Sequence, residues 1–494
     1  MIAGGFEFNE DGAIYKRVTS QIKQAIQSGS LLPDARLPSV RALASQYGVS
    51  LTTALKALRT LEDENYAVVK PKAGFFVARP KNIGMLLASI VHEPKKIAPL
   101  DELTELHLSM LGTDCRIRLD LANGISTLYP IKKLGLLMRQ IGYAQPALLG
   151  DTIKGTGYLP LKTEIARRAV NYGCNIDIND LLITNGCVEA ISLALRATVV
   201  AGDAVAVESP CYFVLLQMLQ NLGLKVVEVE TSSLGYVNTE TLDYLFTNQI
   251  VKAFVTLANN NNPLGTTIPD SAKQFIARLA DEHGVVIIED DIFGDTTYGD
   301  QRPFPMLAFT PNAILCSGFS KTVAPAIRIG WIYSALHMRK ITALKYTSSM
   351  GTSLLPQAAV AEILRNGGYD LHLRKLRKEL YIQLSKIREA VLQYFPAGTI
   401  VSAPKGGYVL WVEMPPGSLN ARELFLKARS CGIGIAPGHI FATDTRFDNC
   451  FRLNAGFGWN EGVLAAIQKL ATWCAQSLAE YQASLRQEIT TQDA

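Results

Sequence analysis

At 494 residues, the chain is too long for one ordinary hydrophobic core, so two or three domains are expected. Hydrophobic residues make up 48% and charged residues 19% of it, which is typical of globular proteins and excludes a largely disordered chain. The net charge is only +4, but residues 1–80 hold ten Lys and Arg against seven Asp and Glu, which predicts a basic N-terminal module on a nearly neutral body.

The eight cysteines show no CxxC spacing, and the six histidines form no metal-ligand cluster with them. We therefore expect reduced thiols and no metal site. The N-terminus, MIAGGFEFNEDGAIYKR, lacks the basic and apolar regions of a signal peptide. No apolar run reaches the roughly 20 residues needed to span a bilayer. These features predict a cytoplasmic protein without membrane contact.

The first segment has apolar residues spaced by four, which places them on one face of a helix. That helix is expected to end at Gly29, and its apolar face consists of Ile14, Val18, Ile22 and Ile26.

Two further helices and a hairpin are predicted next. Ser39 can cap a helix that runs to about residue 47, and Ser50 can cap another over 51–65, with Gly48 in the turn between them. That third helix is expected to end at Asn65, which tolerates a left-handed cap. The strand-like runs AVVK and GFFVAR flank PKAG and predict a two-stranded wing.

Residues 13–79 resemble the winged helix-turn-helix of the GntR family and match its pattern PxxxLPSxRxLAxxxxVSxxT without a gap. The resemblance implies that the helix after Ser50 enters the major groove of DNA. Leu51 and Leu55 are apolar where base-reading polar residues are common, which weakens the case for sequence-specific reading. The alternative is a helical bundle with a solvated basic face. The resemblance implies DNA contacts from Ser39, Arg41, Ser50, Thr52, Thr53, Lys56, Lys70 and Lys72.

The predicted organisation is an α+β head over residues 1–80, a linker over 81–116 and an α/β body over 117–480. The linker is not rich in Gly and Ser, and part of it is expected to pack on a domain or a partner subunit. Its apolar residues are Met85, Leu86, Leu87, Ile90 and Val91.

Seven runs of the body are apolar nearly throughout, as strands covered on both faces must be. They alternate with helical segments, so a mainly parallel sheet is expected, with functional residues where its strands end. The seven runs are LLIT, AVAVE, KVVEVE, AFVTL, VVIIEDD, AILCSG and IGWIYS.

Several strand ends carry chemistry that fits one cofactor. A helix begins directly after Asn185-Gly186, so the main-chain N–H groups of residues 186–188 (Gly186, Cys187 and Val188) form a seat for a phosphate. Asn262 precedes a proline in a turn and can present its amide. Asp290 closes a buried strand, a costly place for a carboxylate unless it meets a cation.

The run CSGFSKTVAPAIRIGW adds Lys321, with Ser317 and Ser320 before it and Arg328 after it. A lysine that attacks a carbonyl must be partly neutral, which apolar surroundings and a second cation favour. Taken singly, each feature has a plain alternative: a solvated lysine, a helix-capping aspartate, an ordinary Asn-Pro turn. Together they meet the needs of pyridoxal phosphate, which has a phosphate, a pyridine nitrogen, a ring oxygen and an aldehyde.

Residues 117–475 resemble the fold-type I aminotransferases. The motifs that match, in order, are the glycine phosphate loop, ExPxY at 208–212, NPxG at 262–265, EDD at 289–291, SxxxKxxxPxxRxG at 317–330 and FRLN at 451–454. The resemblance implies a large sheet domain, a smaller C-terminal subdomain over about 365–480, and bound pyridoxal phosphate.

The same resemblance implies a role for each residue. Lys321 would bind the cofactor covalently, Asp290 would pair with its pyridine nitrogen and Asn262 would face its ring oxygen. Tyr212 would stack on the ring, and Arg328, Ser320 and Ser317 would join the phosphate seat. Arg452 would bind a substrate carboxylate as a bidentate fork. Phe293 stands where the family has a tyrosine that donates to the ring oxygen, so binding without efficient transamination is expected.

A GntR head on an aminotransferase-like body resembles the MocR subfamily of transcription regulators. That resemblance implies a homodimer, an operator with two half-sites, and an amino-acid-like effector with a carboxylate. Two alternatives remain: a working aminotransferase that carries a DNA-binding head, and a relic that binds no cofactor. The residues do not identify the effector, the operator or the direction of regulation.

Overall fold

The computed structural model divides the chain into two compact units, Met1–Val91 and His92–Ala494, which are described separately. Most of the predicted linker, as well as Ile14, Ile26, Gly29, Asn65 and Lys72, lies outside the described residues. The structure describes residues 15, 18–19, 21–23, 35–63, 66–70, 74–77, 109–110, 112, 114–151, 155–232, 235–299 and 301–492.

The first unit contains the predicted helices and wing. The described residues among 15–23 are helical, α2 spans Val40–Tyr47 and α3 spans Leu51–Asp63. The Oγ atom of Ser39 accepts a hydrogen bond from the Ala42 N–H at 3.2 Å, and Gly48 ends α2 with a left-handed φ of 63°. Both residues therefore have the predicted roles: Ser39 caps the start of α2, and Gly48 allows the turn into α3.

The wing of this unit consists of β1 (Ala67–Lys70) and β2 (Gly74–Val77), which pair antiparallel. Val18 and Ile22, from the predicted apolar face of the first helix, are buried against α2, α3 and β1. The small core thus joins all three helices and the wing, as in a winged helix-turn-helix. Its fully buried centre consists of Ala54, Ala57, Leu58 and Leu61 of α3.

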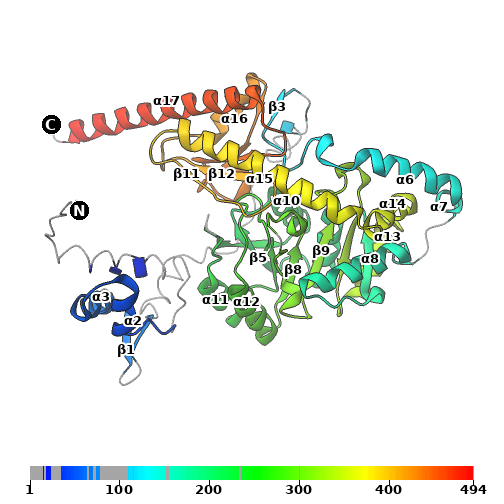
Figure 1. Ribbon diagram of the computed structural model, residues 1–494, viewed down its shortest axis with the longest axis horizontal. Coiled ribbons are helices and arrows are strands. Elements are labelled where there is room, and N and C mark those ends of the chain that lie inside the picture. The colour runs from blue at the N-terminus through cyan, green and yellow to red at the C-terminus, as the bar shows by residue number, and fades with distance from the viewer. Residues whose placement is uncertain are drawn as a thin grey trace, which may run out of the picture. The chain divides into compact units, whose positions relative to one another are not determined.

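A seven-stranded sheet, counted over the described residues, forms the centre of the second unit, with the order β4-β10-β9-β8-β7-β5-β6 (Figure 1). All seven predicted strands are present, and every residue of five of them is buried, as covered strands require. Their bounds are β4 Leu181–Thr184, β5 Ala204–Ser209, β6 Lys225–Glu230, β7 Ala253–Thr256, β8 Val286–Asp290, β9 Ile314–Gly318 and β10 Gly330–Tyr333.

The sheet is mainly parallel, and β10 alone runs antiparallel to its neighbours β4 and β9. The start of β10 therefore lies at the same edge as the carboxyl ends of the other strands. Arg328, two residues before β10, reaches this edge although it precedes a strand instead of following one.

Helices cover the sheet, and one end of the body is built from α6, α7, α13 and α14 (Figure 1). The bounds of the helices in this part are α6 Ile131–Ala144, α7 Ala147–Gly150, α8 Leu159–Ala169, α9 Cys187–Thr198, α10 Phe213–Asn221, α11 Thr239–Thr247, α12 Asp270–His283, α13 Met338–Ser349 and α14 Leu354–Arg365.

The C-terminal subdomain has a four-stranded sheet of order β11-β12-β15-β14. Two long helices, α15 and α17, lie side by side over it (Figure 1), and α17 runs past residue 480 to Gln492. The bounds are β11 Ile400–Val401, β12 Val409–Glu413, β14 Ala436–Pro437, β15 Cys450–Asn454, α15 Gly368–Tyr394, α16 Ala421–Ser430 and α17 Glu461–Gln492.

The start of the body belongs to this subdomain as well. Strand β3 (Ile117–Arg118) pairs in parallel with β13 (Ile433–Gly434), and Met110 and Leu119 join the subdomain's core. The chain thus enters the body beside its C-terminal part before it builds the large sheet. The sequence shows no periodic pattern that would predict this pairing, because the two strands have two residues each and lie more than 300 positions apart.

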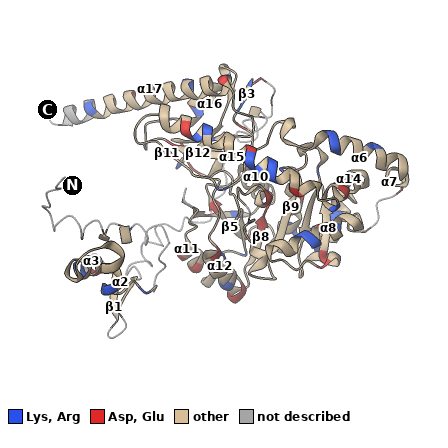
Figure 2. Cartoon of the chain, in the orientation of Figure 1, with Lys and Arg blue, Asp and Glu red and all other residues tan. Residues whose placement is uncertain are grey.

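Charged side chains on the described body helices are of both signs (Figure 2), which agrees with a nearly neutral body. Within the described parts of the chain, no helix combines the length and the apolar character that crossing a membrane requires.

Candidate functional site

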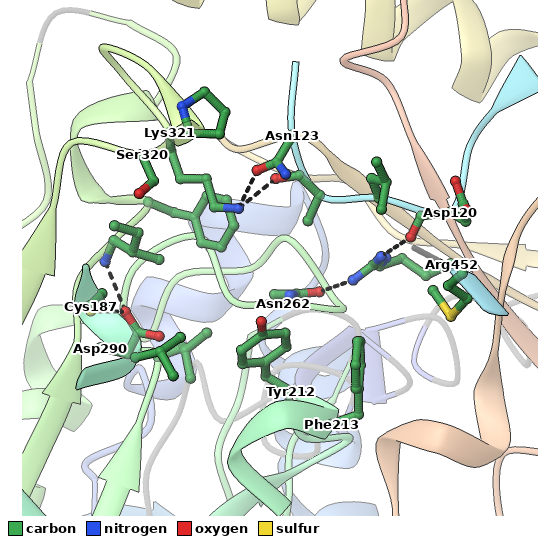
Figure 3. A pocket seen from close by; sticks show the side chains of 18 of the residues that line it. Asp120, Asn123, Cys187, Tyr212, Phe213, Asn262, Asp290, Ser320, Lys321 and Arg452 are labelled. Carbon is green, nitrogen blue, oxygen red and sulfur yellow. Dashed lines mark hydrogen bonds between the residues drawn. The ribbon is translucent and has the colours of Figure 1, made fainter. Parts of the chain in front are cut away.

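A cavity of about 230 Å³ opens where the strands of the large sheet end. Its walls carry the side chains that follow β4, β5, β7, β8 and β9, so five remote segments converge on one space. Figure 3 shows this convergence from close by. The residues predicted from the sequence that line it are Cys187, Val188, Tyr212, Asn262, Asp290, Ser320, Lys321, Arg328 and Arg452.

Lys321 reaches into this cavity from the loop after β9. Its Nζ atom donates to the carbonyl oxygen of Ala122 at 3.0 Å and to Oδ1 of Asn123 at 2.5 Å (Figure 3). Burial lowers the pKa of Lys321 to about 8. The sequence predicts Arg328 as the second cation beside this lysine. In the structure Arg452 also lowers the pKa of Lys321, and by more than Arg328 does. A substantial fraction of the amine is therefore neutral near physiological pH.

Hydrogen bonds connect the Lys321 loop to the C-terminal subdomain. The hydroxyl of Tyr408 donates to the main-chain carbonyl of Lys321. The hydroxyl of Tyr369, on α15, lies 2.8 Å from both Thr322 Oγ1 and Asp295 Oδ2. These contacts hold the lysine's main chain, so its position depends on residues far along the sequence.

Asp290 ends β8 and is buried. Its Oδ1 atom accepts from the Ile292 N–H and from the Cys187 thiol, both at 3.1 Å. Burial raises the pKa of Asp290 to about 6, and these donors oppose the rise. Among the described residues, no Lys or Arg lies within ion-pair distance of it, so a cationic ligand group would find an uncompensated carboxylate here.

The predicted phosphate seat is formed where β4 passes into α9. Gly186 has a φ of +92°, and a Cβ atom at this position would lie 2.3 Å from Nη2 of Arg328. Only glycine therefore lets the guanidinium come this close. Arg328 donates from Nη2 to the Asn185 carbonyl at 3.3 Å and from Nη1 to Ser320 Oγ at 3.4 Å. Ser317 does not line the cavity, and its hydroxyl donates to the main chain of Asp291.

Arg452, on β15, lies fully inside the protein at the other end of the cavity. It donates from Nη1 to Oδ1 of Asn262 at 2.7 Å and from Nη2 to the carbonyl of Asp120 (Figure 3), while no described residue accepts a hydrogen bond from its buried Nε. Burial lowers the pKa of Arg452 to about 10, which still leaves it cationic at neutral pH. No carboxylate among the described side chains pairs with it, so the site suits an incoming carboxylate.

The Asn262 turn is positioned by a buried carboxylate. Glu208, at 3% exposure, accepts from Thr256 Oγ1 at 2.5 Å, from the Leu257 N–H at 2.8 Å and from Asn261 Nδ2 at 2.7 Å. Since Arg452 engages the amide oxygen of Asn262, the amide nitrogen is the atom left to donate into the cavity.

Sequence patterns do not single out residues 120–123, which form one wall of the cavity, nor Met110 and Phe213, which also line it. The segment DLAN has no periodicity, and its only signal is the turn-forming pair Asn123-Gly124 at its end. Phe293 also lines the wall, with the Lys321 ammonium 5.3 Å from its ring centroid. It can pack there but donates no hydrogen bond.

The first unit holds the predicted DNA contacts. The hydroxyls of Ser39 and Ser50 cap α2 and α3, Ser50 by accepting from the Thr53 N–H at 3.0 Å. Lys56 places its ammonium 4.2 Å from the Tyr15 ring centroid. Arg41 and Thr52 are exposed, as are Leu51 and Leu55, while only the main chain of Lys70 is described and Lys72 lies outside the described residues.

Comparisons with known proteins agree with this division. Residues 14–77 match the family of bacterial regulatory proteins of the gntR type, and residues 143–470 match aminotransferase class I and II. The α-aminoadipate aminotransferase LysN of Thermus thermophilus, solved with N-(5'-phosphopyridoxyl)-L-leucine, has the same fold as the body. Its TM-score is 0.70 at 21% identity, over 78% of this chain and 96% of that one.

Relatives with both parts are also found. The uncharacterized HTH-type transcriptional regulator YdcR of Escherichia coli (strain K12) is 32% identical, over 92% of this chain and 98% of its own. The uncharacterized HTH-type transcriptional regulator YjiR of the same strain is 30% identical, over 92% and 97%. The chain therefore belongs to the MocR-type subfamily of GntR regulators, in which a winged helix-turn-helix is joined to a fold-type I aminotransferase-like domain.

Proposed function

We propose that this protein is a DNA-binding transcription regulator whose body holds pyridoxal phosphate and senses an amino-acid-like carboxylate. The observation that carries the proposal is the set of unpaired charges in the cavity. Lys321, Arg328, Arg452 and Asp290 all line it, and none has an ion-pair partner among the described residues. Of these four, Asp290 and Arg452 are buried, whereas Arg328 is exposed. A buried charge persists only where a ligand or partner compensates it.

The donor set fits this cofactor group by group. Arg328 and the start of α9 suit a phosphate, Asp290 suits a protonated pyridine nitrogen, and the Asn262 amide suits the ring oxygen. When bound, pyridoxal phosphate supplies an aldehyde that captures primary amines reversibly. Lys321 holds the amine that would meet it, and the lowered pKa keeps part of that amine neutral.

The effector end of the cavity follows from Arg452. A carboxylate ligand would take the guanidinium face that Asn262 and Asp120 leave open, while its amine lies toward Lys321. The change that the effector causes in the free energy of DNA binding must equal the change that DNA causes in the free energy of effector binding. Such coupling energies are typically about 1–3 kcal/mol. The MocR-type architecture supports a regulator over a free-standing enzyme, because a DNA-binding head adds nothing to transamination.

A homodimer that binds two half-sites is part of the proposal. Exposed apolar side chains gather on α6 and α7, which both pack on α14, and such surfaces mark protein interfaces. The side chains concerned are Ile131, Leu136, Tyr143 and Leu149. Two-fold symmetry of the protein would be mirrored in a repeated or palindromic operator.

A visible absorption spectrum of the full-length protein, recorded with a panel of amino acids, tests the proposal. A bound-cofactor band is expected, and one class of amino acid should shift it lastingly and change the affinity for operator DNA. Release of a 2-oxo acid at every turnover would instead make the protein a working aminotransferase. No band, even with added pyridoxal phosphate, would overturn the proposal and leave a DNA-binding head on a body without a cofactor.

The pH dependence of cofactor capture is a separate prediction. The neutral amine is the reacting form, and the pKa of Lys321 is lowered to about 8. The capture rate of protein freed of cofactor should rise with pH through about 8 and then level off. Stopped-flow absorbance measures it, with N-acetyl-lysine as the control, whose rate should keep rising to about pH 10. A protein profile that follows the control would contradict the lowered pKa.

A further inference from the structure

We propose that the Cys187 thiol is a positioning residue that orients and keeps ionised the Asp290 carboxylate, an inference that rests on the cofactor site proposed above. The first residue of α9 was expected to offer only its main-chain N–H to a phosphate. Its side chain instead points to the end of β8, where Sγ lies 3.1 Å from Oδ1 of Asp290 (Figure 3).

The hydrogen bonds that Asp290 accepts involve only one of its two carboxylate oxygens. Both donors, the Cys187 thiol and the Ile292 N–H, meet Oδ1, and Oδ2 receives no hydrogen bond from the described residues. Asp290 lines the cavity. The thiol and the amide therefore hold one oxygen on the protein side and leave the other for a ligand group in the cavity.

The thiol can act only as a donor here. Cys187 is 7% exposed, and burial, followed by the neighbouring Asp290 charge, raises the pKa of its thiol well above the ordinary value. The start of α9 packs on β8, and Gly186 fixes the turn before it, so the side chain has little freedom. A protonated thiol beside a carboxylate donates its hydrogen to that carboxylate.

Loss of the thiol should raise the pKa of Asp290 further. Burial already raises that pKa to about 6, and hydrogen bonds to the charged form lower it. A protonated Asp290 cannot pair with a pyridinium. The titratable groups that face Asp290 are Cys187 on α9, Cys316 on β9, Tyr212 before α10, Lys321 after β9 and the adjacent Asp291.

The test is pyridoxal phosphate affinity of the full-length protein between pH 5 and 9, measured by equilibrium titration. In wild type the affinity should fall as the pH drops through about 6, where Asp290 takes up a proton. In Cys187→Ala the midpoint of this fall should lie about one pH unit higher. Affinity should then be about ten-fold lower than in wild type at pH 5, below both midpoints, and about two-fold lower at pH 7. Protonation of the phosphate affects every variant alike, so the shift between variants isolates Asp290.

Two variants control the experiment. Cys187→Ser retains a donor with a shorter reach and should recover much of the wild-type midpoint. Cys316→Ala removes a still more deeply buried thiol from the position paired with Asp290 in the sheet, and should leave the midpoint in place. A midpoint in Cys187→Ala equal to that of wild type would overturn the inference.

A spectroscopic measurement covers the case in which Cys187→Ala does not fold. The S–H stretching band of Cys187 in the wild-type protein, assigned by difference from Cys187→Ser, should lie at lower frequency than that of Cys316. A band at the frequency of an unbonded thiol would also overturn the inference. If wild type itself binds no pyridoxal phosphate, the proposed function fails instead, and the two failures are thus distinguishable.

Discussion

Lys321→Ala is expected to abolish the visible absorption band of covalently held pyridoxal phosphate. Alanine has no amine, and the cavity offers no second lysine among its described lining residues. The phosphate seat and Asp290 remain, so weak non-covalent binding should persist. Borohydride reduction followed by mass spectrometry measures the covalently held fraction, which should fall from nearly complete to background.

The substitution should leave the fold intact. It removes the hydrogen bonds to Ala122 and Asn123, but it also removes a cation that Arg452 and Arg328 repel. Its net effect on the free energy of unfolding should be within about 1 kcal/mol. Lys386→Ala, at an exposed position of α15, is the matched control and should keep the band. A covalent adduct of undiminished yield in Lys321→Ala would place the reactive amine elsewhere.

Arg452→Lys is expected to weaken effector binding by roughly 30-fold or more, because the guanidinium fork is replaced by a point charge. Lysine cannot hold Asn262, the Asp120 carbonyl and a ligand carboxylate together. Titration of the absorption change with the effector measures the loss. The band itself should remain, since Arg452 lies at the opposite end of the cavity from the phosphate seat.

A ligand without the carboxylate serves as the control for this experiment. The amine that lacks the effector's carboxylate should bind wild type and Arg452→Lys with similar, weak affinity. Arg388→Lys changes an arginine of α15 that donates to the Ser402 carbonyl, and it should leave effector binding as in wild type. If Arg452→Lys weakened the amine and the amino acid equally, the guanidinium would have a structural role and would not read the carboxylate.

Helix ends, strands and cofactor motifs of this protein could be predicted from its sequence because they depend on local interactions. Ser39 and Gly48 bound the short helix α2, because a cap and a left-handed turn depend mainly on neighbours in the chain. The seven apolar runs became the seven strands of the sheet, since strands covered on both faces carry mostly apolar side chains. The ordered motifs around Lys321 and Asp290 indicated the family, which the comparisons confirm.

The tertiary structure decided which distant groups meet. Lys321 bonds to a segment almost 200 residues before it, Arg452 bonds to Asn262 across 190 positions, and Cys187 meets Asp290 across 103. An apolar run does not tell the direction of its strand, so only the sheet shows that β10 is antiparallel and brings Arg328 to the cavity. Such contacts depend on strand order and chain direction, which are global properties of the fold and leave no periodic trace in the sequence.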